Sequence, residues 1–244
     1  SLAKGTTRID NFLDGEDCLH TIRIFQQLGV HIEHDGTNVL IESEGFESFK
    51  EPVEPLYFGN SGTTARLMLG ILCNLPFHTV LYGDPYLTVR PMDRVVIPLQ
   101  KMGATIDGRH GGSYLPLAIR GKRLKGITYD IHVKSAQVTS AILLAGILAQ
   151  DQTSVTELAK TRDHTENILT AFGADIQVEG NEITVTSNNE LTAVDVTVPG
   201  DISSAAFFLV AAAIVPESVV TLVDVGLNET RTGIIDVLLA MGAN

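Results

Sequence analysis

Met92-Asp93-Arg94-Val95-Val96-Ile97-Pro98-Leu99-Gln100-Lys101-Met102-Gly103-Ala104 is the stretch that decides the fold, because it is the clearest copy of a pattern that occurs four times. Its apolar residues, counted from Met92, recur at i, i+3, i+4, i+7 and i+10, which places them on one face of a helix. Gly103 follows the last of them, where a glycine commonly ends a helix as its C-cap. The stretch therefore predicts an amphipathic helix that ends at Gly103.

The same closing phrase ends three other apolar-periodic stretches. The four phrases are Leu28-Gly29-Val30, Met102-Gly103-Ala104, Phe172-Gly173-Ala174 and Met241-Gly242-Ala243. Their glycines stand at positions 29, 103, 173 and 242, so that successive glycines are separated by 74, 70 and 69 residues. Since this period is too long for common solenoid repeats, it predicts subdomains that share one core.

Each of the first three phrases is followed by an alternating strand, a turn and a second strand. These predicted hairpins cover residues 31–43, 105–120 and 175–186. A second recurring phrase leads from small and hydroxyl residues into an Ala- and Leu-rich helix that we expect to be buried. These helices are predicted at residues 59–75, 135–149 and 200–215, and the strands that follow them at 79–82, 154–158 and 219–225.

The repeat predicts an α/β protein built of βαβαββ subdomains. The phase of the pattern changes at Val198-Pro199-Gly200, so we expect one domain over residues 1–198 and the beginning of a second over 199–244. The pattern also predicts that the chain is cut at both ends. Residues 1–5 look like the tail of an Ala-rich helix, and the chain stops at Asn244, where a hairpin is due.

Composition narrows the classes of function. The 244 residues include 29 acidic and 17 basic side chains, for a net charge of −12, and no basic run argues for a nucleic-acid partner. The longest apolar run, residues 205–215, is shorter than the roughly 20 residues of a membrane span, so we expect a buried helix and no membrane partner. With no signal-peptide pattern, and with Cys18 and Cys73 too few for a disulfide framework, a cytosolic protein is expected.

Two segments around the first buried helix could carry chemistry. Residues 59–64, Gly-Asn-Ser-Gly-Thr-Thr, combine glycines and hydroxyls at a helix N-terminus, a combination that attracts anions. A turn that merely caps the helix explains them equally well. Arg90, just before Pro91, suits a carboxylate or phosphate, although a surface pairing with Asp84 or Asp93 is an equal alternative.

Two further segments begin later helices. Ser135 is explained as a cap, whereas the amide of Gln137 suits a polyhydroxyl substrate, with a plain helix start equally open. Asp163 and Glu166 have the spacing of a capping box, which accounts for both acids. Together the four segments predict a site for a small polyanion. The basic side chains they contribute are Arg66, Arg90, Lys134, Arg162 and His164.

No metal chemistry is expected. His31 and His34 are three residues apart on a strand and therefore face opposite sides, so an exposed hairpin explains them better than a ligand pair. No Cys or His cluster has zinc spacing. The sequence also contains neither a nucleophile elbow nor a dinucleotide-binding glycine fingerprint.

The order and spacing of four phrases closely resemble the 5-enolpyruvylshikimate-3-phosphate synthase family, of the type found in Gram-positive bacteria. The phrases are residues 59–66, Arg90-Pro91-Met92, Ser135-Ala136-Gln137 and Arg162-Asp163-His164-Thr165-Glu166, and the likeness spans essentially the whole chain. It implies two domains, each an inside-out α/β barrel of three subdomains around buried helices. It also implies transfer of the enolpyruvyl group of phosphoenolpyruvate to the 5-hydroxyl of shikimate 3-phosphate, with release of phosphate and without a cofactor.

The resemblance assigns residues to both substrates. Those for shikimate 3-phosphate are Ser135, Ala136, Gln137, Thr161, Arg162 and His164, with Arg162 at the phosphate. Those for phosphoenolpyruvate, whose site the herbicide glyphosate also occupies in the family, are Gly62, Arg90 and Gln137. The active site is expected in a cleft that closes between the two domains of a monomer in the shikimate pathway to aromatic amino acids.

The chain also departs from the family pattern. The family's N-terminal Lys-Ser phrase is absent, and its proton-transferring Asp, Glu, Lys and Arg residues are expected beyond Asn244, so we expect this chain alone to be inactive. Tyr86 stands where Ser is common, and Thr139 where Lys is common.

Two alternative functions stay open. The sister transferase that acts on UDP-N-acetylglucosamine carries a reactive Cys before its own Arg-Pro phrase, whereas residues 85–89 contain none and Cys73 lies in an apolar helix. A non-catalytic repeat module that binds an anion would explain the missing acids but not the coincidence of four phrases.

Overall fold

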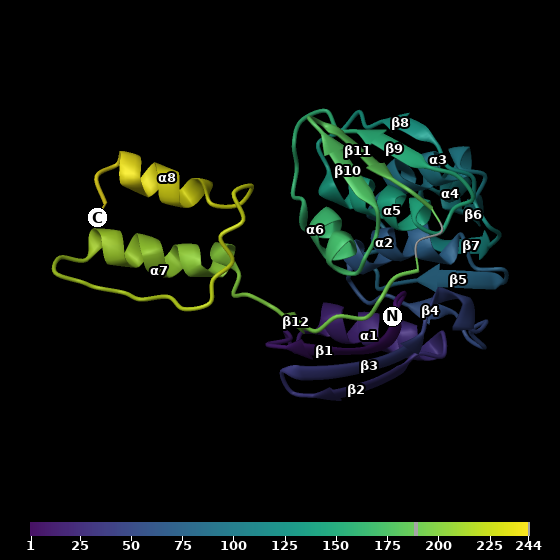
Figure 1. The fold of residues 1–244 in the computed structure, drawn as a ribbon, viewed down its shortest axis with the longest axis horizontal. Coiled ribbons are helices and arrows are strands. Elements are labelled where there is room, and N and C mark those ends of the chain that lie inside the picture. Colours follow the sequence, from purple (N-terminus) through teal and green to yellow (C-terminus); the bar gives the residue numbers. More distant parts are fainter. Residues whose placement is uncertain (188–189, 244) are drawn as a thin grey trace. The chain divides into compact units, whose positions relative to one another are not determined.

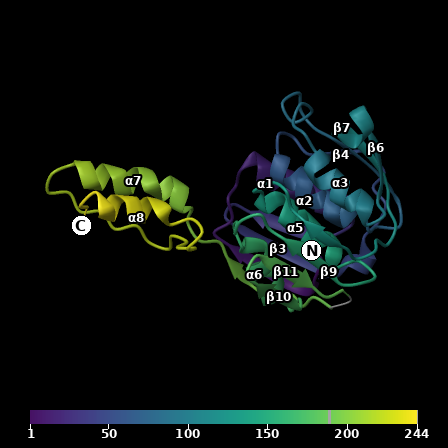
Figure 2. The same ribbon diagram turned by 90° about the horizontal axis from the view of Figure 1, so that it is seen from above.

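The computed structural model describes residues 1–187 and 190–243, so the prediction that concerns Asn244 lies outside it. The chain forms two compact units, Ser1–Val196 and Thr197–Asn244, which are described separately (Figure 1). In the first unit, three small β-sheets surround two central helices, α2 (Gly62–Leu72) and α5 (Ala136–Gly146). Figure 2 shows the same two helices side by side inside the unit.

Each sheet contains one of the three predicted hairpins. The first has β1 (Lys4–Asp10), β3 (Asn38–Glu44) and β2 (His31–Asp35) in that order, and α1 (Glu16–Gln27) precedes its hairpin. The second has β4 (Leu56–Tyr57), β5 (His78–Tyr82), β7 (Tyr114–Arg120) and β6 (Thr105–Gly108), with α3 (Asp93–Lys101), and α4 (Arg109–Gly112) in the turn. The third has β10 (Ile176–Glu179), β11 (Glu182–Val185), β9 (Thr153–Thr156) and β8 (Thr128–Asp130), with α6 (His164–Ala171).

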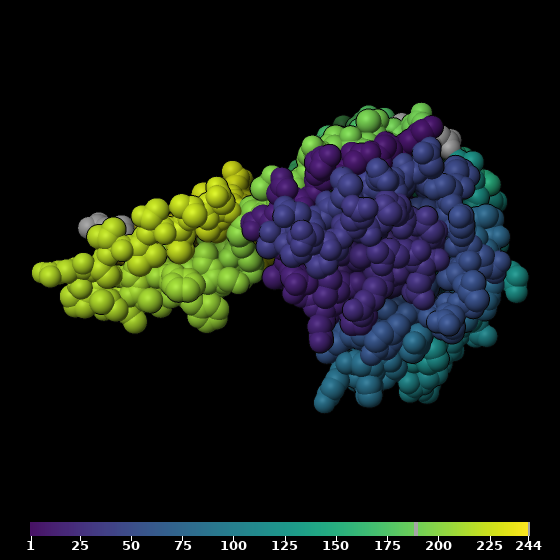
Figure 3. All heavy atoms as spheres, turned by 90° about the horizontal axis from the view of Figure 1, so that it is seen from below, coloured from purple at the N-terminus to yellow at the C-terminus, as the bar shows by residue number. Residues whose placement is uncertain are grey.

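The remaining short elements are a 3-10 turn, η1 (Phe46–Ser48), after the first hairpin, and β12 (Val196–Thr197) at the boundary between the units. Figure 3 shows, as purple and blue spheres, the face of the first unit built largely from its N-terminal residues. All three hairpins lie where the alternating pattern predicts them, and alternation is visible in β7, where Leu115, Leu117 and Ile119 are buried.

Each central helix connects two parallel strands of one sheet. In the chain, β4 precedes α2 and β5 follows it, and these two strands pair in parallel; β8 and β9 pair in the same way before and after α5. This crossover lays each helix against its own sheet and brings the two helices together in the middle. The buried apolar residues of the unit join into one core, and α2 and α5, each with eight buried residues, lie within it.

The glycine phrases end their helices as predicted. Gly103 has a φ of +97°, and its N–H donates to the carbonyl of Gln100 while the N–H of Ala104 donates to that of Leu99, both at 2.9 Å. This is the hydrogen-bond pattern of a Schellman cap. The glycines at 29, 173 and 242 have φ values of +91°, +91° and +92° and form the same pair of bonds. The 70-residue period is therefore a repeat of structure.

The close packing of α2 on α5 depends on Gly70. A Cβ atom at this position would lie 2.2 Å from the backbone oxygen of Ala141, closer than any real contact allows. Asn74, one turn later, bridges the helices because its side-chain N–H donates to the carbonyls of Gly70 (3.1 Å) and Ala145 (3.2 Å). The helices can approach this closely only where one of them lacks a side chain.

We therefore expect Gly70→Ala to lower the free energy of unfolding by about 1 to 3 kcal/mol, the usual cost of overpacking a core. Urea denaturation of this chain measures the loss. Gly233→Ala is the matched control, because it also lies in a helix but its Cβ would meet open space. Equal stability of the Gly70 variant and the parent would mean that the two helices can separate without cost.

Three expectations about the chain's ends are wrong. Lys4 and Gly5, taken as the tail of a helix, lie in β1, where they pair with Glu44 and Ser43 of β3. The predicted strand at 219–225 is absent; the segment forms only one bridge, between Gly200 and Val225. A strand needs a neighbouring strand for its backbone, and among the described residues β1 pairs with β3 along its length whereas 219–225 pairs only at Gly200.

The third concerns the second unit, in which α7 (Ile202–Ile214) and α8 (Gly233–Ala240) pack on each other. The helix predicted at 200–215 forms, but it is not buried. Its apolar residues face all directions, and α8 covers only part of them, so the side chains of Phe207 and Ile214 remain 79% and 73% exposed.

The helices within residues 1–187 and 190–243 include none with the length and apolar character of a membrane span.

Candidate active site

The segment at residues 59–64 caps α2. The Ser61 hydroxyl oxygen accepts the backbone N–H of Thr64 at 3.2 Å and lies 2.7 Å from the Thr64 hydroxyl, so the helix begins at Gly62. The capping interpretation is therefore correct for Ser61. It leaves the hydroxyl of Thr63 and the first N–H groups of the helix for other partners.

Ser135 stands at the N-cap position of α5, but its side chain forms no cap hydrogen bond, so the expectation that capping explains this hydroxyl is wrong. Gln137 lies in the first turn of the same helix. Ser135, Ala136 and Gln137 are all partly exposed, and this end of α5 therefore presents a hydroxyl and an amide at its surface.

Arg66 joins the starts of α2 and α5. Its Nη1 donates to Oε1 of Gln137 and its Nη2 to the carbonyl of Pro91, both at 2.9 Å. Gln137 in turn donates from Nε2 to the hydroxyl of Thr63 at 2.9 Å. Three of the segments singled out in the sequence thus meet at one place, and the amide of Gln137 has a fixed orientation.

Arg90 lies beside this cluster. Its Nη2 donates to Oδ1 of Asn60 at 2.6 Å, and no ion pair with Asp84 or Asp93 forms in the described part of the chain. The surface-pairing alternative for Arg90 is therefore wrong. A Cβ on Gly62 would lie 3.0 Å from Nη1 of Arg66 and 3.2 Å from Nη1 of Arg90, so this glycine is next to both guanidinium groups.

The cluster carries excess positive charge. Burial lowers the pKa of Arg66, and the nearby cations Arg94 and Arg90 lower it further, while Asp93 acts in the opposite direction. Two helix N-termini add their positive ends at the same place. A small anion bound here would relieve this repulsion.

The fourth segment, around Arg162, departs from the expected capping box. Asp163 is the N-cap residue of α6, but its side chain makes no cap hydrogen bond, and Glu166 is buried. Burial, followed by the charges of Glu157 and Asp163, raises the pKa of the Glu166 carboxyl. The capping box is therefore wrong, because its first half is missing: the Asp163 side chain accepts no hydrogen bond from the start of the helix.

Arg162 and His164 are exposed, and Thr161 is partly exposed. The structure shows no contact that joins Arg162 to the Arg66 cluster. It does attach the loop of Arg162 to α5, because the hydroxyls of Ser140 and Thr165 lie 2.6 Å apart and Glu157 bonds to both Thr139 and Thr161.

Sequence reasoning missed Glu157, whose signal is slight: an acidic residue directly after a strand that is otherwise uncharged. It also left Asn60 and Thr63 without individual roles. Both stand inside the recognised phrase, and only the fold pairs them with Arg90 and Gln137.

The histidines and cysteines considered as possible ligands or nucleophiles have structural explanations. The expected opposite orientation of His31 and His34 agrees with their different partners, Glu33 and the Gly36 carbonyl. Within the ranges described, no group of three or more His, Cys, Asp or Glu side chains could hold a metal ion. Cys18 and Cys73 are free thiols, and burial raises the pKa of Cys73 to about 12, which makes it a poor nucleophile.

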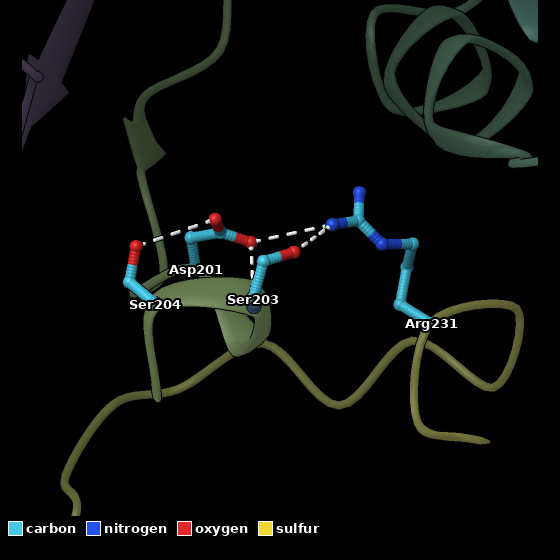
Figure 4. Close-up of polar contacts among 4 residues, drawn as sticks. All are labelled: Asp201, Ser203, Ser204 and Arg231. Atoms are coloured by element: carbon cyan, nitrogen blue, oxygen red, sulfur yellow. Dashed lines mark hydrogen bonds and ion pairs between the residues drawn. The ribbon is translucent and has the colours of Figure 1, made fainter. Parts of the chain in front are cut away.

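In the second unit, Asp201 caps α7, as Figure 4 shows. Its Oδ1 accepts the Ser203 N–H at 3.0 Å and lies 3.4 Å from Nη2 of Arg231, which also donates to the Ser203 hydroxyl. The hydrogen bond from Ser203 is the main cause of the lowered pKa of Asp201. The helix start explains these contacts within this unit.

Comparison with known proteins covers the whole chain. Residues 1–244 match the family model described as "EPSP synthase (3-phosphoshikimate 1-carboxyvinyltransferase)". Proteins named 3-phosphoshikimate 1-carboxyvinyltransferase from Oceanobacillus iheyensis and Bacillus subtilis are 58% and 54% identical to it over 243 residues. In each case the match covers 100% of this chain and 57% of the relative, so the chain spans little more than half of their length.

Among solved structures, EPSP synthase from Acinetobacter baumannii is 47% identical, with a TM-score of 0.95 over 100% of this chain and 56% of that one. This likeness confirms the α/β fold of repeated subdomains that the sequence predicts.

Proposed function

The chain belongs to the EPSP synthase family, and from that premise we propose that the whole protein transfers the enolpyruvyl group of phosphoenolpyruvate to the 5-hydroxyl of shikimate 3-phosphate. The observation that carries the proposal is the junction at Arg66, where the starts of α2 and α5 and the turn at Pro91 meet. It gathers hydroxyls, an oriented amide and two cations at two helix N-termini, a combination suited to small phosphorylated acids.

Shikimate 3-phosphate binds at the start of α5 and the loop before α6. Ser135 and Gln137 bond its hydroxyl groups, with the backbone of Ala136 between them. Arg162 meets the phosphate, and Thr161 and His164 line the same pocket. The unused Ser135 hydroxyl supports this assignment, and so does the exposed guanidinium of Arg162, because a doubly charged phosphate favours a cation it can reach without displacing another partner.

Phosphoenolpyruvate binds between Arg90 and the start of α2. Arg90 holds its anionic groups, Gly62 leaves room beside the two guanidinium groups, and Gln137 contacts both substrates. The excess positive charge around Arg66 supports the placement of a second anion here. No cofactor takes part in this reaction.

The 5-hydroxyl adds to C2 of phosphoenolpyruvate while C3 gains a proton, and the resulting adduct then eliminates phosphate. The acids and bases for these steps belong to the rest of the whole protein. The whole protein is a cytoplasmic monomer in which residues 1–198 form most of the substrate-binding domain and residues 199–244 begin the second. The boundary between the compact units, at Val196 and Thr197, supports this division.

Phosphate release from the two substrates tests the proposal. The whole protein should release phosphate only when both substrates are present, whereas the chain of residues 1–244 should release none. No release by the whole protein would overturn the proposed function. Release by the pure 244-residue chain would contradict the assignment of proton transfer to the remainder.

The sister transferase that acts on UDP-N-acetylglucosamine is less well supported. That reaction relies on a reactive thiol, whereas Cys73 is buried with its pKa raised to about 12. Failure of UDP-N-acetylglucosamine to support phosphate release is the expected result in the same assay.

A further inference from the structure

A buried carboxylate lies behind the loop that carries Arg162. Glu157 follows β9 and is only 6% exposed. Its Oε1 accepts the hydroxyls of Thr139 (2.6 Å) and Thr161 (2.5 Å), and its Oε2 accepts the backbone N–H of Thr161 at 2.9 Å. Three donors satisfy the charge, as a buried carboxylate requires.

These bonds connect two parts of the proposed shikimate 3-phosphate site. Thr139 lies four residues after Ser135, hence one turn further along the same face of α5. Thr161 directly precedes Arg162 in the chain. The carboxylate of Glu157 therefore ties the start of α5 to the loop of residues 157–163 at the point where that loop presents Arg162.

The backbone of Glu157 is fixed as well, since its N–H donates to the carbonyl of Asn181 at 2.9 Å. By contrast, the structure shows no hydrogen bond or ion pair of the Arg162 side chain within residues 1–187 and 190–243. The direction in which Arg162 leaves the loop is thus set by the backbone at Thr161, and Glu157 is what fixes that backbone.

We propose that Glu157 is a positioning residue for the binding of shikimate 3-phosphate, an inference that rests on the proposed function. It makes no contact with the substrate. It holds Thr161 and Arg162 at a fixed distance from Ser135 and Gln137, so that one ligand can reach the loop and the helix at once. The proposal predicts an effect on the acceptor substrate and little effect on phosphoenolpyruvate.

The test uses steady-state kinetics of the whole protein with Glu157→Gln. The glutamine can still accept the two hydroxyls, but its amide group would face the backbone N–H of Thr161, donor against donor. We expect the KM for shikimate 3-phosphate to rise about 5- to 10-fold and the KM for phosphoenolpyruvate to change by less than about 2-fold. Glu179→Gln, an exposed carboxylate of the same sheet, is the matched control and should change neither.

A double-mutant cycle separates positioning from general stability. If Glu157 acts through Arg162, then Glu157→Gln should add nothing to the KM for shikimate 3-phosphate once Arg162→Ala is present. An equal fold-change in both backgrounds would overturn the proposal. Thr139→Ser, which keeps the hydrogen bond to Glu157, should behave like the parent, and Thr139→Val, which removes that bond, should raise the same KM; this pair decides the question if Glu157→Gln fails to fold.

The experiments distinguish failure of the proposed function from failure of the inference about Glu157. If the unmodified whole protein releases no phosphate, the proposed function falls and this inference falls with it. If it turns over normally and Glu157→Gln leaves the KM for shikimate 3-phosphate unchanged, only the inference is overturned.

Discussion

Replacing Arg162 by alanine is expected to weaken the binding of shikimate 3-phosphate to the chain of residues 1–244 by about 10- to 150-fold, since a charge-assisted hydrogen bond contributes about 1.5 to 3 kcal/mol. The parent chain should itself bind weakly, because only the proposed substrate-binding part is present. Arg162 is exposed, and its side chain has no hydrogen bond or ion pair with any other described residue, so its removal leaves no buried group unpaired and the loss reports on the ligand alone.

Calorimetric titration of the 244-residue chain measures this loss. Arg162→Lys should have an intermediate affinity, because an ammonium keeps the charge but not the two-pronged geometry of a guanidinium. Arg120→Ala removes the same charge from an exposed position on β7 and should bind like the parent. Equal affinity of Arg162→Ala and the parent would remove Arg162 from the site.

The parts of the fold that could be predicted from sequence are those fixed by local chemistry. The helix that ends at Gly103 needs only an apolar face and a residue that tolerates a φ of +97°. Likewise the hairpin turns at Asp35-Gly36 and Gly180-Asn181 are set by a few neighbouring residues. Since the same local signals recur every 70 residues, the repeat itself was accessible from sequence.

The wrong expectations share a different cause. Whether α7 is buried, or whether residues 219–225 form a strand, depends on which surface lies next to them, and a run of apolar letters carries no such information. The burial of Glu166 is of the same kind, because the spacing of Asp163 and Glu166 does not reveal which surface covers that carboxyl group.

In the candidate site, too, some features are set by local sequence and others by contacts between distant residues. Its phrases could be placed at helix starts from sequence, since capping residues and glycines mark those positions. The bond between Arg66 and Gln137 joins residues 71 positions apart, and that between Gln137 and Thr63 spans 74. Such pairs follow only from the packing of α2 on α5, which is why Thr63 received no role before the fold was known. Glu157 received none because only the fold brings it to Thr139 of α5.

The second large effect is expected when Gly62 is replaced by alanine. The family resemblance implies that glyphosate occupies the phosphoenolpyruvate site beside this glycine. Gly62 is the first residue of α2 and is not among the glycines with positive φ, so alanine can adopt its backbone conformation and is the better helix former. The alternative that Gly62 is needed for an unusual backbone therefore does not apply, and Gly62→Ala should fold normally.

The added methyl would instead act on the anion site. It would stand 3.0 Å from Nη1 of Arg66 and 3.2 Å from Nη1 of Arg90, so both guanidinium groups must shift by a few tenths of an ångström. Arg66 is tied to Gln137 and to Pro91, whereas Arg90 is exposed and bonds only Asn60 in the described chain, so most of the movement should fall on Arg90. The methyl itself occupies space between Gly62 and Arg90, and the longer of two competing ligands is penalised more.

In the whole protein, Gly62→Ala should therefore weaken inhibition by glyphosate about 5- to 150-fold, from an overpacking cost of about 1 to 3 kcal/mol, while raising the KM for phosphoenolpyruvate less. Steady-state inhibition of the two proteins gives the ratio of the inhibition constant to that KM, and this ratio should rise. If the methyl merely disturbed Arg90, an anchor common to both ligands, the two constants would increase together. An unchanged ratio would thus assign Gly62 to the placement of Arg90, and a raised ratio to discrimination by ligand length.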